Sequence, residues 1–592
     1  MELIKRRLEA LRSWMKKNAI DAFVVPSTDP HDGEYVPQHW EARKWISGFT
    51  GSAGTFVITN SNAAVWTDSR YFIQAEQQLE GTGIRLMKAG LDSTPTIAEY
   101  LAKELKPGSN VGFDGWCCTS YDFIPSSLNA VATSDPFDTI WEGRPELPLD
   151  QVVIQPLDFA GESAESKISR IRAVLKERGA DATVLTRLDD IAWTLNLRGN
   201  DVHCNPVFIS YLVISQSKAN LFIDKRKITG EVESYLAKCG VECYEYADFL
   251  KFDFHLPTDR LTAFCLDDSC NYAVRDYITN ISANFCLLRG DNSPIVPPMK
   301  AVKTKQEQDG FRNAMLRDGV ALVRFEMWLE ENVANGNLTE ISIDERLTSL
   351  RAGQDLFKGI SFDTIAAYQS HGAIVHYEAT PETDAEIKPE GMLLIDSGAQ
   401  YQDGTTDITR TYALGEVTDE QKRDYTLVLK GHIALSSAVF PEGTCGTQLD
   451  VLARSAMWKH GINYLHGTGH GVGSYLNVHE GPHQIRMNHM PAVLKAGMTV
   501  TDEPGIYKKD KYGIRIENTL LITDDRETEF GKFLKFEPLT LCPIDKKPIV
   551  REMLTVDEIE WINNYHKTVY DKLAPLLNDE EKAWLANATS KI

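Results

Sequence analysis

Several features are scarce or missing in this 592-residue sequence, and each absence excludes a class of protein. No window approaches the ~18 apolar residues of a transmembrane helix. The N-terminal stretch MELIKRRLEALRSWMKKNAIDAF is charged throughout and lacks the apolar region of a secretory signal. Only ten cysteines occur, and their spacing is more typical of ordinary thiols than of a zinc site. We therefore expect a reduced, cytoplasmic protein without a membrane anchor.

Basic residues are also in the minority. The chain has 62 Lys and Arg against 84 Asp and Glu, which gives a net charge of −22. We find no long basic run that offsets this excess locally. Because contacts to phosphates need clustered Lys and Arg, we expect no nucleic-acid partner.

The composition is otherwise that of a folded globular protein, with 43% hydrophobic and 25% charged residues. At ~100–200 residues per domain, the length predicts about three or four domains. Two proline-rich segments without regular periodicity, residues 142–156 and 289–300, are interpreted as linkers. We therefore predict domains over residues 1–145, 157–290 and 298–592, the last ending in a helical extension over about residues 550–592.

The first two domains resemble each other in sequence. The segment LRSWMKKNAIDAFVV (residues 11–25) aligns with IRAVLKERGADATVL (residues 171–185) at an offset of 160. Each is an amphipathic helical pattern followed by Asp-Ala and a β-rich apolar run. This pattern predicts two α/β domains of one type, derived from a duplication.

The third domain begins and ends with helical periodicity. Residues 305–333 form one long helical pattern, and the tail 553–592 forms another. The tail carries a stripe of large apolar side chains: Trp561, Tyr565, Val569, Leu573 and Leu577. We expect this stripe to dock on this chain or on a second subunit rather than to bind a cofactor.

Histidine is distributed unevenly, which directs attention to the third domain. Nine of the fourteen histidines lie between His371 and His489, about three times as many as even spacing predicts. Histidine supplies metal ligands and carries protons near neutral pH. We therefore expect the chemistry of the protein in this span.

The segment MLLIDSGAQYQDGTTDITRTYAL, residues 392–414, predicts a β-hairpin around Asp403-Gly404. If the turn is centred between Tyr401 and Gln402, Asp396 and Asp407 face each other across the hairpin, with Cβ atoms about 4.5–5.5 Å apart. Asp396 follows an apolar run and should be partly buried, so its charge needs a partner.

Two further segments contribute candidate ligands. LHGTGHGVGSYLNVHEGPH, residues 465–483, holds His466, His470, His479 and His483 among glycines that let backbone pack closely. In residues 501–523, Glu503 precedes a Pro-Gly turn, while Arg515 and Glu517 share one face of an alternating strand pattern and could point into one cavity. These two could also form a surface charge pair.

Together these segments supply one imidazole and four carboxylates: Asp396, Asp407, His470, Glu503 and Glu517. This set suits divalent ions such as Mn²⁺, Fe²⁺, Co²⁺ or Zn²⁺, and four negative charges can neutralise two of them. Two metals about 3.5–4 Å apart can activate a bridging hydroxide and polarise a carbonyl. The residues therefore predict metal-assisted hydrolysis without naming a substrate.

The same five residues, in the contexts IDSGAQY, TDITRT, HGTGHGVG, DEPG and IRIEN, resemble the dinuclear ligands of the pita-bread metallopeptidases. Within that family the chain resembles the long, three-domain, cytosolic Xaa-Pro aminopeptidases (aminopeptidase P) over essentially its whole length. Matching stretches include AAVWTDSRYF in the first domain, LDDIAWTLNLRGNDVHCNPVFISY in the second, and HGAIVHYEAT and LNVHEGPH in the third.

The resemblance implies an α/β and α+β fold: two creatinase-type α/β domains followed by a pita-bread catalytic domain. It implies removal of the first residue from peptides with proline in the second position, by a hydroxide bridging two divalent ions. Mn²⁺ is the expected metal, with Co²⁺, Zn²⁺ and Fe²⁺ as alternatives. It further implies a cytoplasmic homodimer that acts on proline-containing peptides.

The resemblance also assigns roles to residues. Asp396 would bind one metal, His470 and Glu503 the other, and Asp407 and Glu517 would bridge them. Glu503 would accept the proton of the nucleophile. The remaining assignments are contacts to substrate: His376 and His479 at the transition state, His466 near the proline ring, Arg70 from the N-terminal domain, and Tyr507 and Arg515.

Three alternatives remain open at this point. Prolidase, which cleaves only X-Pro dipeptides, shares the five ligands, although the three-domain length and the TDSR segment favour an aminopeptidase. A non-enzymatic binding protein on the same scaffold, or a metal-free hydrolase of the creatinase type, would have lost ligands that are all retained here.

Overall fold

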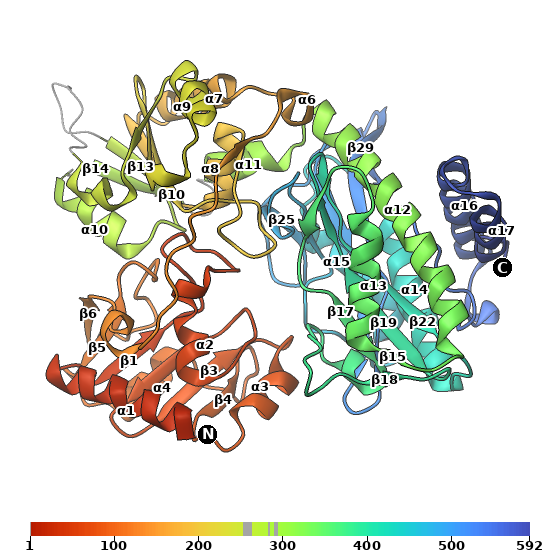
Figure 1. Ribbon diagram of the computed structural model, residues 1–592, viewed down its shortest axis with the longest axis horizontal. Helices are drawn as coiled ribbons and strands as arrows, with labels where there is room; N and C mark the ends of the chain where they lie inside the picture. Colours follow the sequence, from red (N-terminus) through yellow and green to blue (C-terminus); the bar gives the residue numbers. More distant parts are fainter. Residues whose placement is uncertain (1, 253–262, 282–283, 289–293) are drawn as a thin grey trace. The chain divides into compact units, whose positions relative to one another are not determined.

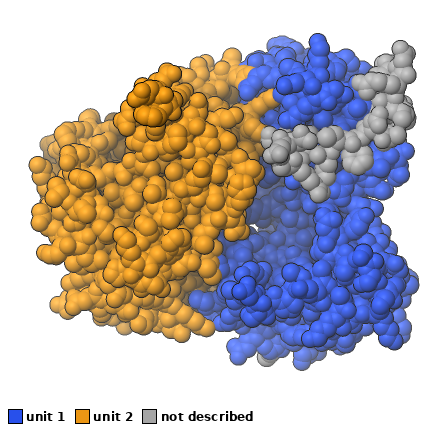
Figure 2. Space-filling model, turned by 180° about the vertical axis from the view of Figure 1, so that it is seen from behind, with its two compact units in different colours: residues 1–154, 163–296 blue, residues 155–162, 297–592 orange. Residues whose placement is uncertain are grey.

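The computed structural model describes residues 2–252, 263–281, 284–288 and 294–592. Residues 289–293 of the second predicted linker therefore lie outside the described residues. The chain forms two compact units, coloured separately in Figure 2. Unit 1 comprises residues 1–154 and 163–296, and unit 2 comprises residues 155–162 and 297–592.

Unit 1 contains two six-stranded sheets with the same topology (Figure 1). The first has the order β4-β3-β2-β1-β5-β6, and the second has the order β12-β11-β10-β8-β13-β14. In each sheet one strand, β1 or β8, pairs antiparallel with the neighbour on one side and parallel with the neighbour on the other side. The strands are β1 (Ala22–Val25), β2 (Thr55–Thr59), β3 (Ala63–Thr67), β4 (Arg85–Lys88), β5 (Asn110–Asp114), β6 (Asn129–Thr133), β8 (Ala182–Leu185), β10 (Ser210–Ser215), β11 (Ala219–Ile223), β12 (Val241–Tyr244), β13 (Ala263–Asp267) and β14 (Asn284–Leu288).

Helices cover these sheets, and a short two-stranded pair, β7 (Val153–Ile154) with β9 (Leu197–Arg198), adds to the second repeat. The helices of unit 1 are α1 (Glu2–Lys17), α2 (Ala42–Ser47), α3 (Phe72–Leu79), α4 (Ile97–Glu104), α5 (Phe137–Ile140), α7 (Ala164–Glu177), α8 (Leu188–Leu195), α9 (Gly230–Lys238) and α10 (Tyr272–Ile281). Helix α11 (Val296–Ala301) lies where the chain passes into unit 2.

The duplication extends to individual contacts. Helices α1 and α7 bury equivalent positions at the offset of 160, for example Leu11 and Ile171. Asp21 accepts a hydrogen bond of 2.8 Å from the backbone N–H of Asn110. Its counterpart Asp181 accepts one of 2.8 Å from the N–H of Ala263. Each aspartate thereby fixes the start of the parallel strand pair, and the prediction of two related α/β domains is confirmed.

Unit 2 is built on the long helix α12 (Lys305–Val333), whose bounds equal those predicted. A capping box explains its start, because the Thr304 side chain accepts from the N–H of Glu307 while the Glu307 carboxylate accepts from the N–H of Thr304. The other helices are α6 (Leu157–Ala160), α13 (Glu340–Ala352), α14 (Asp419–Ser436), α15 (Gly446–Trp458), α16 (Val556–Leu573) and α17 (Asp579–Ala588).

The helices of unit 2 pack on a set of small, mostly antiparallel sheets, of which β17-β19-β22 and β23-β30-β29-β26 carry most of the candidate site. The strands are β15 (Leu338–Thr339), β16 (Phe357–Ile360), β17 (Ile365–Tyr368), β18 (Glu386–Ile387), β19 (Met392–Ser397), β20 (Ala399–Tyr401), β21 (Gly404–Thr405), β22 (Ile408–Ala413), β23 (Val439–Pro441), β24 (Gly469–Gly471), β25 (Glu480–Ile485), β26 (Thr499–Asp502), β27 (Gly505–Lys508), β28 (Tyr512–Arg515), β29 (Asn518–Thr528) and β30 (Gly531–Pro538).

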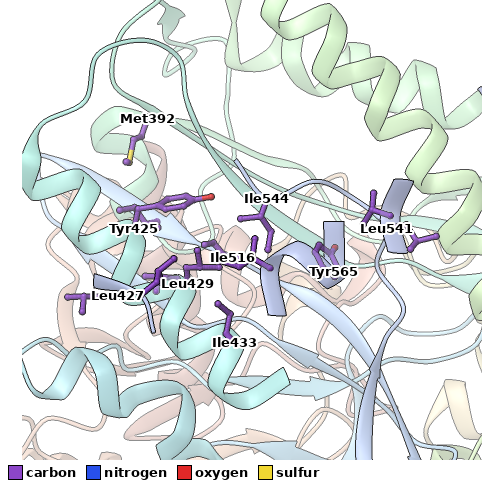
Figure 3. Packing of buried hydrophobic residues seen from close by; sticks show 14 of the residues in the cluster. Met392, Tyr425, Leu427, Leu429, Ile433, Ile516, Leu541, Ile544 and Tyr565 are labelled. Atoms are coloured by element: carbon purple, nitrogen blue, oxygen red, sulfur yellow. The ribbon is translucent and has the colours of Figure 1, made fainter. Parts of the chain in front are cut away.

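The C-terminal stripe docks on its own chain. Tyr565, Val569 and Leu573 of α16 are buried in the largest apolar core of unit 2, and Leu577 follows them there. Figure 3 shows Tyr565 near Ile516, Ile544 and Leu541 in this core. Because Ile516 precedes the candidate ligand Glu517, the tail packs directly behind the candidate site. In the part of the chain that is described, no helix combines the length and apolar character needed to cross a bilayer.

The predicted hairpin forms, but its predicted register is wrong. Asp396 pairs with Thr409 rather than with Asp407, and Tyr401 pairs with Gly404, so Gln402 and Asp403 make the turn. The cause is tertiary: the Arg317 guanidinium on α12 donates two hydrogen bonds to the Asp403 carboxylate, at 2.9 and 2.7 Å. The two candidate ligands are therefore diagonal neighbours, with Asp407 two residues before the partner of Asp396.

Candidate metal centre

The five predicted ligands come from the ends of strands in unit 2. Asp396 lies near the end of β19, and Asp407 immediately precedes β22. His470 is the middle residue of β24. Glu503 follows β26 and Glu517 precedes β29, two strands that pair with each other. Segments of these strands, spread over 121 residues of sequence between Asp396 and Glu517, therefore converge on one place.

Four of the five ligands lie close together. Ligand atoms of Asp407, His470 and Glu517 all lie within 4.8 Å of one another. His470 Nε2 is 3.4 Å from Asp407 Oδ2 and 3.6 Å from Glu503 Oε1. Asp396 is buried next to them, and its Oδ1 atom has no hydrogen-bond partner among the described residues. A buried carboxylate oxygen without a hydrogen-bond donor is suited to binding a cation.

The local backbone presents the imidazole of His470 in the orientation that a metal requires. Its Nδ1 lies 2.9 Å from the carbonyl oxygen of Gly471, and since a carbonyl only accepts, Nδ1 carries the hydrogen. The Nε2 atom faces Asp407 and Glu503, whose carboxylates outweigh the effect of burial and raise the pKa of His470 to about 9, and a metal ion would take the place of the Nε2 proton. Gly469 is required beside it, because a Cβ at that position would overlap the carbonyl oxygen of Thr501.

The carboxylates lie close together in a buried place, and this shifts their pKa values. Burial raises the pKa of Glu503 to about 7; His470 opposes this shift, and Asp407 adds to it by repulsion. Burial, followed by the charges of Asp407 and Asp396, raises the pKa of Glu517 well above its usual range. Repulsion of this kind is relieved by cations. The donor set and its electrostatics therefore fit two divalent ions.

Arg515 and Glu517 are buried rather than a surface charge pair, and one threonine links them. Arg515 Nη2 donates to Asp396 Oδ2 at 2.6 Å, and Arg515 Nε donates to Thr409 Oγ1 at 3.2 Å. The Thr409 hydroxyl in turn donates to Glu517 Oε2 at 2.7 Å. Thr409 therefore orients a ligand carboxylate. This role of Thr409 cannot be predicted from the sequence, because threonine is common in strands whatever its function.

A chain of donors leads from Arg515 to His466. Arg515 Nη1 donates to the Tyr507 hydroxyl oxygen at 2.7 Å. His466 Nδ1 is 2.7 Å from the carbonyl of Gly467, so it carries the hydrogen and His466 Nε2 accepts from the Tyr507 hydroxyl at 2.8 Å. These three predicted substrate contacts thus form one connected group beside Asp396.

The two predicted catalytic histidines differ in how the structure places them. The ring of His479 meets that of His470 edge to face, with centroids 4.4 Å apart. His376 is half-buried and follows Val375, whose carbonyl accepts from Arg515 Nη2 at 3.3 Å. Arg70 belongs to unit 1, where its Nε donates to Asp68 Oδ1 at 2.9 Å, so its role at this site stays a prediction.

Two buried carboxylates that sequence analysis missed hold the segments carrying these histidines. Glu340 accepts from the Tyr377 hydroxyl at 2.8 Å and from His371 Nδ1 at 2.9 Å, on either side of His376. Glu480, which follows His479, forms an ion pair with Lys303, and both side chains are 1% exposed. Nothing in the sequence around Lys303 indicates this pairing. Glu480 lies within the LNVHEGPH stretch, but that stretch by itself indicates no role for it.

Comparison with known families covers most of the chain. Residues 309–524 match metallopeptidase family M24, and residues 532–592 match the C-terminal region of that peptidase group. Residues 7–142 and 143–307 each match a creatinase/prolidase N-terminal domain.

Individual relatives agree with these matches. The chain is 40% identical to aminopeptidase P1 of Arabidopsis thaliana over 99% of both chains, and 41% identical to a probable Xaa-Pro aminopeptidase P of Laccaria bicolor over 99% of this chain and 93% of that one. Among solved structures it is similar to an X-prolyl aminopeptidase from Caenorhabditis elegans, described as a cytosolic enzyme with a di-nuclear active site. That similarity has a TM-score of 0.94 and 35% identity, and it covers 100% of both chains. An Xaa-Pro dipeptidase from Bacillus anthracis matches 65% of this chain and 99% of its own length, with a TM-score of 0.51 and 25% identity.

Proposed function

The chain belongs to the aminopeptidase P group of metallopeptidase family M24, and we infer that it is a metal-dependent Xaa-Pro aminopeptidase. It hydrolyses the bond between the first residue of a peptide and a proline in the second position. One observation supports this conclusion: candidate metal ligands, among them Asp407, His470 and Glu517, lie together in a chain that matches Xaa-Pro aminopeptidases along its whole length.

We propose that Asp396 holds one metal ion, that His470 and Glu503 hold a second, and that Asp407 and Glu517 bridge the two. When bound, two divalent ions would supply a hydroxide nucleophile at neutral pH and polarise the scissile carbonyl. The Oδ1 of Asp396, which has no hydrogen-bond donor among the described residues, and the Nε2 of His470, which faces Asp407 and Glu503, support this assignment. The oxygen-rich donor set supports Mn²⁺ as the metal, with Co²⁺, Zn²⁺ and Fe²⁺ as the alternatives.

Glu503 is proposed to accept the proton that the nucleophile loses. Its Oε1 atom lies 3.6 Å from His470 Nε2, beside the place where the nucleophile would be held, which is the position that a proton acceptor needs. Its Oε1 accepts a hydrogen bond of 3.2 Å from the Thr501 hydroxyl, which fixes its orientation. His376 and His479 are proposed to donate hydrogen bonds to the developing oxyanion or to the leaving nitrogen.

Selectivity for proline follows from the chemistry of the X-Pro bond. This bond is a tertiary amide without an N–H, and the proline ring fixes its geometry. His466 is proposed to lie beside that ring, held through Tyr507 by Arg515. Arg515, Tyr507 and Arg70 are proposed as further substrate contacts, Arg70 from the first domain.

Turnover on three substrates tests the function. We expect release of the first residue from an X-Pro-Pro tripeptide, little turnover of the matched X-Ala-Pro peptide, and complete loss of activity after treatment with a chelator. An X-Pro dipeptide separates the prolidase alternative. Strict preference for the dipeptide, or turnover that survives the chelator, refutes the assignment.

Domain boundaries, quaternary structure and location are also proposals. We propose domains over residues 1–145, 157–290 and 298–592, supported by two creatinase/prolidase N-terminal matches, a metallopeptidase match and the match to the C-terminal region that follows it. We propose a cytoplasmic enzyme that forms a homodimer, and the exposed apolar side chains of α15 and of the loops that follow it are proposed as interface residues: Val451, Trp458, Leu465, Met487 and Val493. A charged double variant, Val451→Glu with Met487→Glu, should dissociate the dimer in analytical ultracentrifugation, and a wild-type monomer at micromolar concentration refutes it.

A further inference from the structure

Arg410 lies behind the candidate metal centre and is enclosed by acceptors. Its side chain is 2% exposed and donates six hydrogen bonds of 2.6–3.0 Å. Four go to backbone carbonyls, one to the Asn518 side chain and one to the hydroxyl of Tyr565. A guanidinium held by this many partners has a single orientation and can fix the backbone around it.

Two of these bonds hold the backbone of the candidate ligand Glu517 next to that of Thr409. Arg410 Nη1 donates to the carbonyl of Glu517 at 2.6 Å and to the carbonyl of Thr409 at 3.0 Å. The same two residues are joined by the Glu517 N–H, which donates to the Thr409 carbonyl at 3.0 Å, and by the Thr409 hydroxyl on the Glu517 carboxylate. Arg410 therefore holds together the residue that ligates and the residue that orients it.

Helix α16 of the C-terminal tail completes this arrangement. The Tyr565 hydroxyl accepts from Arg410 Nη2 at 2.9 Å and lies 2.9 Å from the carbonyl of Cys542 and 3.0 Å from that of Thr540, to which it can donate. Tyr565 is 6% exposed. One hydroxyl on α16 thus connects the guanidinium to the segment that follows β30.

The network continues to the second strand that carries a ligand. Asn518 Oδ1 accepts from Arg410 Nη2 at 2.9 Å, and Asn518 Nδ2 lies 3.2 Å from His432 Nε2. His432 Nδ1 is 3.3 Å from Asp502 Oδ2. Asn518 and Asp502 are paired residues of β29 and β26, and each is the immediate neighbour of a ligand, Glu517 or Glu503. The buried chain therefore braces both glutamates at the point where their strands meet.

Resting on the metal-binding function proposed above, we propose that Tyr565 of helix α16 is a positioning residue for the metal centre, acting through Arg410 on Glu517. Tyr565 touches neither metal nor substrate. Partners behind a ligand orient it, and their loss typically costs about 10–100-fold in metal affinity or activity.

The test compares Tyr565→Phe with Tyr570→Phe in the full-length chain. Tyr570 is on the same helix and packs against the same core, which makes it a matched control. After removal of metal, each protein is titrated with Mn²⁺ at 25 °C by calorimetry, and the Mn²⁺-dependent rise in Tm is measured in parallel. We expect Tyr565→Phe to weaken Mn²⁺ binding about tenfold or more. It should also reduce the Mn²⁺-dependent rise in Tm and lower kcat more than it changes KM, while Tyr570→Phe matches the wild type.

Each outcome has one meaning. If Tyr565→Phe lowers Tm without metal but binds Mn²⁺ as the wild type does, the hydroxyl is only structural and the inference is overturned. If Tyr565→Phe does not fold, Arg410→Lys is titrated in its place, since it keeps the charge and loses most of the hydrogen bonds; wild-type affinity there also overturns the inference. A wild-type chain that binds no divalent ion overturns the proposed function and, with it, this inference.

Discussion

Replacing Lys303 by methionine should destabilise unit 2 far more than an ordinary lysine substitution. Lys303 lies two residues before α12, and its ammonium pairs with the carboxylate of Glu480. Both side chains are 1% exposed. Methionine keeps the aliphatic stem and removes the charge, so the Glu480 carboxylate is left buried without its cation.

The expected magnitude follows from that burial. Removing one partner of a buried ion pair costs about 3–5 kcal/mol, because the remaining charge is uncompensated. For the ~300 residues of unit 2, an unfolding entropy of about 2.1 cal/mol/K per residue means that 1 kcal/mol shifts Tm by roughly 1.5 °C, so Lys303→Met should lower Tm by about 5–8 °C. Because protonation removes the buried charge of Glu480 in this variant, the difference in Tm from the wild type should become smaller as the pH is lowered. A second substitution, Glu480→Met, should recover most of the lost stability, because two apolar side chains then replace the buried ion pair.

Thermal unfolding followed by circular dichroism at pH 8 and pH 5 measures these effects. Lys305→Met is the matched control: Lys305 is two residues away, 71% exposed and paired with Asp309 on the surface. Exposed pairs of this kind contribute about 0–1 kcal/mol. The reasoning is refuted if Lys303→Met lowers Tm no more than Lys305→Met, or if the double variant is less stable than the single one.

Three further predictions concern the metal centre and the C-terminal tail. Asp407→Ala should lose bound metal and nearly all activity while its circular dichroism spectrum is retained; full metal occupancy by elemental analysis contradicts the assignment. His479→Ala should keep its metal but lose about 10²–10³-fold in kcat, and unchanged kinetics would return His479 to a structural role. Burial lowers the pKa of His566, which accepts from the N–H of Ile544, to about 3. Its folded-state pKa lies below the unfolded value, so stability present above pH ~6.5 is lost as the pH falls toward ~3. His566→Gln should make Tm fall less steeply as the pH is lowered over this range. A Tm that falls as steeply as that of the wild type contradicts the buried neutral imidazole.

Much of the fold was predictable because its signals are local. The offset of 160 between the two repeats appears in sequence as a helix-strand pattern and in the structure as equivalent hydrogen bonds from Asp21 and Asp181. Residues 305–333 have helical periodicity and a capping box, so both bounds of α12 follow from short-range chemistry. The candidate site is predicted from local signals too, since His470 and Glu503 lie in glycine-rich and Pro-Gly contexts.

The register of the hairpin could not be read from sequence. The pattern around Asp403-Gly404 predicts a turn, but several centres satisfy it. The choice is made by Arg317, which lies on α12, 86 residues from Asp403 in the sequence, and binds its carboxylate. Because a contact of that separation leaves no local trace, Asp396 was placed opposite the wrong residue.

The sequence by itself determined which residues can bind metal, the order in which they occur and the class of reaction they support, because ligand chemistry belongs to individual side chains. Only the tertiary structure decided how those side chains are held. Lys303 reaches Glu480 across 177 residues, and Arg410 reaches Tyr565 across 155. Such contacts have no period and no motif: they exist because burial forces each polar group to find a partner, and which partner is near depends on the whole fold.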